Sequence, residues 1–263
     1  MNNIKSIQKS RLKLRASGQL VLQPTCSYVI IIGKKKEKRM KRTKLKDRVL
    51  PTYTRGEEIF NMVSHIVGAS FGLIFGIICI VIAANHGNTY GIISAIIYGI
   101  SMVLLYIMSS IYHGLRPNRT SKKVFQIIDH CTIFLLIAGS YTPFALCTFR
   151  EYDPYFGWWL FVIIWAVAIL GVVLNSIDLR KYRVFSMICY IVMGWCIIFK
   201  ASVLPELLGT PGLILLVAGG VAYTVGTIFY GLGTKIKYFH SIFHLFIVLG
   251  SILQFFCIAL YVM

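Results

Sequence analysis

The chain has 263 residues, of which 57% are hydrophobic and 14% are charged, and its mean hydropathy is +0.74. Seven stretches of about 20 residues are predominantly apolar, the length that an α-helix needs to cross a bilayer. This composition excludes an ordinary soluble domain and predicts an all-α membrane protein with a single membrane domain.

The N-terminal segment carries most of the basic residues. Of the 27 Lys and Arg residues, 16 lie in residues 1–55, and the others lie in or beside short loops. The net charge of +18 therefore indicates membrane topology and contact with anionic headgroups rather than nucleic-acid binding. We expect residues 1–55 to be a disordered cytoplasmic segment. The composition of the sequence changes abruptly at Met40. This leads to the hypothesis that Met40 is the natural start and that residues 1–39 are a misannotated extension.

The membrane domain, residues 56–263, is predicted to contain seven transmembrane helices. The apolar runs place these helices at about 59–84, 91–113, 124–147, 156–177, 184–204, 211–232 and 240–263. The loops between them are too short to hold a folded domain outside the membrane.

The distribution of positive charge predicts the orientation of these helices. The N-terminal segment and the second, fourth and sixth loops together carry 25 of the 27 basic residues, whereas Arg150 and Lys200 lie on the other side. Because Lys and Arg accumulate in short cytoplasmic loops, the N-terminus is expected in the cytoplasm and the C-terminus outside. The protein would then be a multi-pass protein of the cell membrane, in a bacterium the inner membrane.

Several polar side chains lie inside the first two predicted helices. An ionisable residue at the bilayer centre costs about 2.5–3.5 kcal/mol on insertion scales, so each is a candidate for function. Glu58, Asn61 and His65 share one face of the first helix, because they are three and four residues apart. Ser109 and His113 share one face near the end of the second helix. The predicted topology puts both groups toward the cytoplasmic side.

The third and seventh predicted helices bring further polar residues to the same depth. Asp129 lies near the start of the third helix, and His240 and His244 lie one turn apart at the start of the seventh. Two histidines at i and i+4 are a familiar ligand spacing for Zn²⁺, and His113 could supply a third ligand. Zinc would leave one position for a water molecule and lower its pKa to about 7, while Asp129 or Ser109 interacts with that water.

Simpler explanations exist for each of these residues. A histidine at a helix end can lie among the headgroups, and Asp129 or Glu58 can act as a first-turn charge that the helix dipole favours. Ser109 can bond back to a carbonyl group one turn earlier. His65 either supports a ligand from behind or acts as a proton relay. His130 lies about 100° from Asp129 on the helix, so we expect it outside the site. The seven cysteines form no CxxC pair and are expected to fill apolar space.

The stretches "EEIFNMVSHIVGA", "SSIYHGL", "IIDHCTIFLLIAGSYTPF", "AGGVAYTVGTIFY" and "HSIFHLFIVLGSILQFF" resemble the bacterial hemolysin III proteins. These proteins belong to the progestin and adipoQ receptor family, which includes the adiponectin receptors. The resemblance covers about residues 55–263. It implies seven transmembrane helices with the N-terminus inside, and a zinc ion near the cytoplasmic face. It implies that the metal ligands are His113, His240 and His244. It also implies that Asp129 contacts the metal through water and that Ser109 is the serine of the S-x3-H motif.

Three functions remain open at this point. The first is a zinc-dependent intramembrane hydrolase that cleaves a lipid amide or ester, because the superfamily is similar to alkaline ceramidases. The second is a pore-forming cytolysin, as the family name says, although no export signal or amphipathic pore-forming segment is present. The third is a sensor or receptor of lipid state. In each case the expected partners are membrane lipids, one of which would be the substrate of the hydrolase.

Overall fold

The computed structural model describes residues 42–117, 119–233 and 235–263, and the chain is almost entirely helical within them. Six helices are long and apolar enough to cross a membrane, which confirms the expected all-α membrane class. The expectations about the basic segment up to residue 41 lie outside the described residues. The long helices are α1 (Arg55–Asn85), α2 (Thr89–Gly114), α3 (Thr120–Pro143), α5 (Pro154–Trp195), α6 (Leu204–Leu232) and α7 (Phe239–Tyr261).

The number of long helices differs from the seven predicted because α5 contains two of the predicted helices. Its backbone leaves the helical region at Asp178, where φ is −158° and ψ is 92°. Asp178 Oδ1 accepts hydrogen bonds from the backbone N–H groups of Arg180 and Lys181 at 3.1 and 3.2 Å. A side-chain acceptor of this kind is an N-cap, so a second helical limb begins after Asp178.

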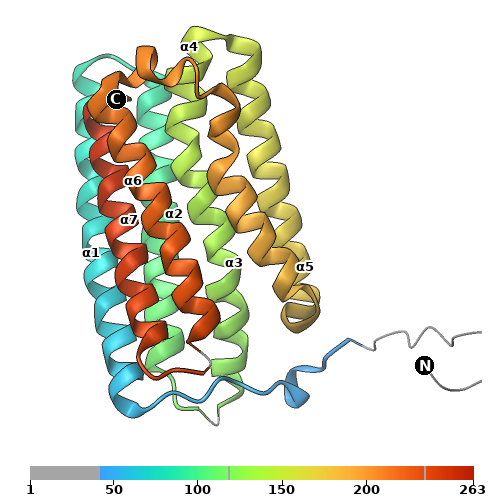
Figure 1. Cartoon of the computed structure of the whole chain (residues 1–263). Helices are drawn as coiled ribbons and strands as arrows, with labels where there is room; N and C mark the ends of the chain where they lie inside the picture. Colours follow the sequence, from blue (N-terminus) through green and yellow to red (C-terminus); the bar gives the residue numbers. More distant parts are fainter. Residues whose placement is uncertain (1–41, 118, 234) are drawn as a thin grey trace, which may run out of the picture. The chain divides into compact units, whose positions relative to one another are not determined.

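The two limbs of α5 lie side by side. Ser186 Oγ donates to Asn175 Oδ1 at 2.7 Å, although a straight helix would separate residues 11 positions apart by about 16 Å. The chain must therefore reverse its direction between them, and Figure 1 shows this reversal at the lower end of α5. Residues 154–177 and 179–195 correspond to the fourth and fifth predicted helices.

Two predicted loops are partly helical. The segment "PELLGT" lies inside α6, where Gly209 takes up a left-handed φ of 65° ahead of Pro211 and bends the helix. The helix expected to end at residue 147 continues through a π-helix, η2 (Phe144–Phe149), and the short α4 (Arg150–Tyr152). Pro143 ends the α-helical hydrogen bonding of α3, because it has no N–H to donate.

The third span is the most enclosed of the six. In its most apolar window 72% of the residues are buried, compared with 28% in α1, α5 and α6. On the other side of the bundle α1 packs closely on α2. A Cβ atom added at Gly76 would lie only 3.0 Å from Gly99 Cα, so these glycines allow the two backbones to meet. Helix α1 also lies beside α7 (Figure 1).

Residues 43–54 cross the end of the bundle where α1, α3 and α7 begin, and we call this segment the strap (Figure 1). Apart from the short 3-10 helix η1 (Leu45–Asp47), it has no regular secondary structure. Thr43 N–H donates to Asp178 Oδ2 at 2.8 Å, which ties one end of the strap to the turn of α5. At the other end Thr54 and Glu57 form a capping box at the start of α1. Glu57 Oε1 also accepts a hydrogen bond from Tyr238 N–H at 2.7 Å. The start of α1 is thereby fixed against the start of α7.

Candidate metal centre

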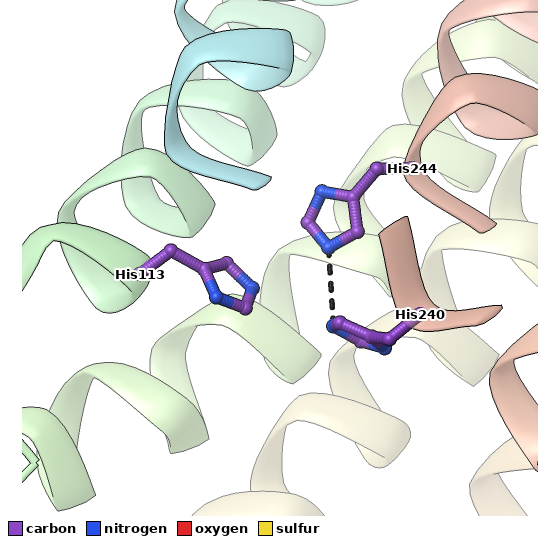
Figure 2. A group of neighbouring side chains, drawn as sticks. All are labelled: His113, His240 and His244. Carbon is purple, nitrogen blue, oxygen red and sulfur yellow. Dashed lines mark hydrogen bonds between the residues drawn. The ribbon is translucent and has the colours of Figure 1, made fainter. Parts of the chain in front are cut away.

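Two of the predicted ligands lie on the first two turns of α7. The N-cap residue Tyr238 has a left-handed φ of 63°, and the chain turns into the helix two residues before His240. His240 and His244 face the bundle interior and are both buried. Their Nε2 atoms are 3.1 Å apart, as the dashed line in Figure 2 shows. The predicted i, i+4 pair on one helix face is confirmed.

The third predicted ligand, His113, comes from the last turn of α2 and points toward the other two histidines (Figure 2). One ligand nitrogen from each of His113, His240 and His244 lies within 4.8 Å of the others. Because His113 is more than 120 positions away from the other two in sequence, the tertiary arrangement of α2 and α7, which both pack on α1, brings the three together. The cluster could hold a metal ion.

The hydrogen bonding of these rings fits a metal centre. His113 Nε2 is buried and has no hydrogen-bond partner within the described part of the chain. An unsatisfied buried nitrogen costs about 1–3 kcal/mol, and coordination of a cation would satisfy its lone pair. Two nitrogens on one tetrahedral zinc ion lie about 3.4 Å apart, close to the 3.1 Å between the Nε2 atoms of His240 and His244.

The other nitrogen of His113 lies close to two residues of α1. Its Nδ1 lies 2.7 Å from Glu58 Oε2 and 3.5 Å from Asn61 Nδ2. Glu58 Oε1 in turn accepts a hydrogen bond from Lys122 Nζ at 2.7 Å. The structure thus places Glu58 and Asn61 directly behind the predicted ligand His113.

His65 is the third polar residue on this face of α1, one turn further along the helix. Its ring centroid lies 3.8 Å from that of His244, and its ring packs edge-to-face with the ring of Tyr106. Neither of its nitrogens has a hydrogen-bond partner among the described residues. His65 does not belong to the cluster of three ligand nitrogens, but it contacts a member of it.

Asp129 and Ser109 line a cavity that also reaches His240 and His244. The Asp129 side chain is 16% exposed because it faces this space. His130, which we expected outside the site, is not part of the three-histidine cluster, although it lines the same cavity. Its Nδ1 is 3.5 Å from Asp129 Oδ2. The 100° separation on the helix was correct, but the cavity is wide enough to receive both side chains.

The cavity has a volume of about 440 Å³ and extends from this polar end between α3, α5, α6 and α7. Beyond the polar end its walls are mostly aliphatic and aromatic. Its far end reaches Gln254 and Leu204, and Gln254 Nε2 donates to Leu216 O at 3.1 Å. A long apolar space with polar groups at one end is the shape that suits an amphipathic molecule.

The strap covers the centre from the end of the bundle at which α1, α3 and α7 begin. The ring of Tyr53 stacks on His240, with centroids 4.8 Å apart and an interplanar angle of 17°. Burial raises the pKa of the Tyr53 phenol well above its usual range, so the phenol stays protonated. The sequence interpretation missed Tyr53, which contacts His240 and His113, and Lys122, which contacts Glu58 behind His113. No local pattern distinguishes either residue from other residues of a basic segment or loop.

Comparisons with known proteins cover the entire centre. The sequence model of the Haemolysin-III related family matches residues 53–255, which include the three clustered histidines. Hemolysin-3 of Bacillus cereus is 42% identical over 207 residues, covering 79% of this chain and 92% of that protein. The Hemolysin-3 homolog of Bacillus subtilis (strain 168) is 38% identical over 209 residues, covering 80% of this chain and 96% of that protein. Monocyte to macrophage differentiation factor of Homo sapiens is 29% identical over 169 residues, covering 62% of this chain and 67% of that protein.

Proposed function

This chain belongs to the Haemolysin-III related family, and from that premise we propose that it is a zinc-dependent intramembrane hydrolase of a lipid amide or ester. The observation that supports this proposal is the position of the three-histidine cluster. Two of its members, His240 and His244, line the polar end of a long apolar cavity, and Asp129 and Ser109 line the same space. A centre of this composition is suited to hydrolysis, and the cavity is suited to an acyl chain.

Zinc is the metal that we propose for His113, His240 and His244. Imidazole nitrogen suits Zn²⁺, and three histidines leave one tetrahedral position open. When bound, the ion would supply Lewis acidity and lower the pKa of water to about 7. Copper, iron and nickel also bind imidazole, so the metal content of the purified protein is a primary measurement.

Asp129 is the proposed general base, and Ser109 is the proposed hydrogen-bond donor to the substrate. Asp129 would take a proton from the attacking water and return it to the departing amine or alcohol. The acyl carbon gains the water oxygen, its bond to nitrogen or oxygen breaks, and a fatty acid and a protonated leaving group result. Ser109 would donate to the carbonyl oxygen as negative charge develops there.

We also propose seven membrane crossings with the N-terminus in the cytoplasm. The two limbs of α5 supply the fourth and fifth crossings, and the basic loops supply the orientation. The metal centre would then lie near the cytoplasmic face, within reach of inner-leaflet lipids. A reporter enzyme fused after Met263 should be active outside the cytoplasm, and activity confined to the cytoplasm would refute this orientation.

Pore formation is the second candidate, because the similar protein of Bacillus cereus is named Hemolysin-3. One purified preparation can distinguish the two functions. We expect about one zinc ion per chain, loss of zinc in the His240→Ala/His244→Ala variant, and zinc-dependent cleavage of an N-acyl lipid in proteoliposomes. A metal-free wild-type protein would refute the hydrolase. Metal without turnover, together with leakage of a dye from the liposomes, would favour the pore.

A further inference from the structure

A buried lysine lies next to the metal centre but is not one of its ligands. Lys122 is 1% exposed, which is rare for a lysine unless its charge is paired. Its Nζ donates to Glu58 Oε1 at 2.7 Å and to Leu115 O at 2.9 Å, and it lies over the Tyr112 ring. These contacts join the start of α3 to the start of α1 and to the end of α2.

Glu58 connects this lysine to the metal centre, because its two carboxylate oxygens have different partners. Oε1 faces Lys122, and Oε2 lies 2.7 Å from His113 Nδ1. An acceptor at Nδ1 fixes the tautomer in which Nδ1 carries the proton and Nε2 carries the lone pair. Nε2 of His113 is the buried nitrogen that has no partner among the described residues. The chain of contacts therefore points the free lone pair of His113 toward His240 and His244.

The competing contact at His113 is weaker. Asn61 Nδ2 is 3.5 Å from the same Nδ1, at the limit of a hydrogen bond, whereas Glu58 is at a short charge-assisted distance. A carboxylate in this buried place needs a compensating charge, and Lys122 is the cation that contacts it. The contact between Glu58 and His113 thus depends on Lys122, which lies on a different helix.

We infer that Glu58 and Lys122 form a positioning pair that acts through His113 to set the affinity of the centre for its metal. Glu58 orients the ring and strengthens its basicity, and Lys122 holds the carboxylate in place. This inference rests on the proposed zinc site, and it assigns to two residues outside the ligand set a role that a purely structural ion pair would not have.

The test compares Glu58→Gln and Lys122→Met with two control variants of the full chain in detergent micelles. Lys123→Met removes a neighbouring charge whose Nζ bonds to Lys46 O, and Glu206→Gln removes an exposed carboxylate from α6. Zinc affinity is measured by competition with a chelator. The absorption spectrum of bound Co²⁺ reports the ligand geometry, and thermal unfolding of the metal-free proteins reports stability separately.

We expect Glu58→Gln and Lys122→Met to weaken zinc binding by about 10- to 100-fold and to change the Co²⁺ spectrum, with little change in the controls. Because both residues act through His113, the double variant should bind zinc about as weakly as Glu58→Gln alone. The double variant also lacks the Glu58 carboxylate, which is left unpaired in Lys122→Met and could prevent that single variant from folding.

Unchanged zinc affinity and an unchanged Co²⁺ spectrum in folded Glu58→Gln would overturn the positioning role and leave the proposed hydrolase intact. A wild-type protein that binds no zinc would overturn the proposed function and this inference together. A lower melting temperature without any effect on metal binding would also overturn the inference, because it would identify a structural ion pair.

Discussion

Gly194 offers a direct test of the cavity as an acyl-chain site. It lies in the second limb of α5 and lines the cavity, and a Cβ atom added there would meet no other atom within 4 Å. The substitution Gly194→Phe should therefore place a ring in the cavity without disturbing the fold. Replacing a helical glycine also removes an entropic penalty of about 0.5–1 kcal/mol, which favours folding of the variant.

The expected magnitude follows from the position of Gly194 along the cavity. Tyr141 OH donates to Gly194 O at 2.8 Å, and Tyr141 lies twelve residues beyond Asp129, about 18 Å along α3. One hydrocarbon leaflet is about 15 Å thick, so only a chain as long as a membrane lipid tail reaches Gly194. Exclusion of three methylene groups at about 0.8 kcal/mol each would reduce kcat/KM about 50-fold.

The assay compares hydrolysis of a long-chain and a short-chain N-acyl lipid by the wild type and by Gly194→Phe. Activity on the long-chain lipid should fall, whereas activity on the short-chain lipid should be retained. Gly231→Phe is the matched control, because Gly231 is exposed near the end of α6 and also has open space around it. Equal loss on both lipids, or unchanged turnover of the long-chain lipid, would refute the assignment of the cavity.

Three further substitutions test the centre and the fold. Asp129→Asn should reduce kcat by about 10²- to 10⁴-fold while the zinc content stays the same, and activity within a few-fold of wild type would remove Asp129 as the base. Asp178→Ala removes the cap of the second α5 limb and should lower the free energy of unfolding by about 1–2 kcal/mol; an unchanged denaturation midpoint would argue against the cap. Gly139→Val should destabilise by at least about 1–3 kcal/mol, because a Cβ there would meet Ser101 Oγ at 2.0 Å; its test is thermal unfolding, with Gly231→Val expected to melt like the wild type.

The helical class and the pairing of His240 with His244 could be predicted because both depend on local or periodic features of the chain. Apolar runs of about 20 residues specify membrane helices, and the spacing of His240 and His244 specifies one helix face. The prediction that His113 lies at the same depth needed only the alternating direction of the helices. Its lateral approach to α7, however, depends on packing and was known only from the structure.

Features that depend on tertiary contacts were missed. Lys122 looked like one of several loop charges, and its burial depends on Glu58 from a helix more than 60 residues earlier. The cap at Asp178 was read as part of a polar loop, although it starts a helix within a very short reversal. The cavity that His130 and Asp129 both line also depends on helix packing, so helix geometry alone did not predict it.

The distribution of the ligands along the chain has a consequence for biosynthesis. His113 lies on the second long helix, whereas His240 and His244 lie on the last, and Glu57 at the start of α1 fixes Tyr238 just before α7. A chain still emerging from the ribosome therefore has one ligand in the membrane and lacks the other two. The proposed metal could bind all three histidines only after insertion of the final helix, so a loaded centre would mark a chain whose assembly is complete.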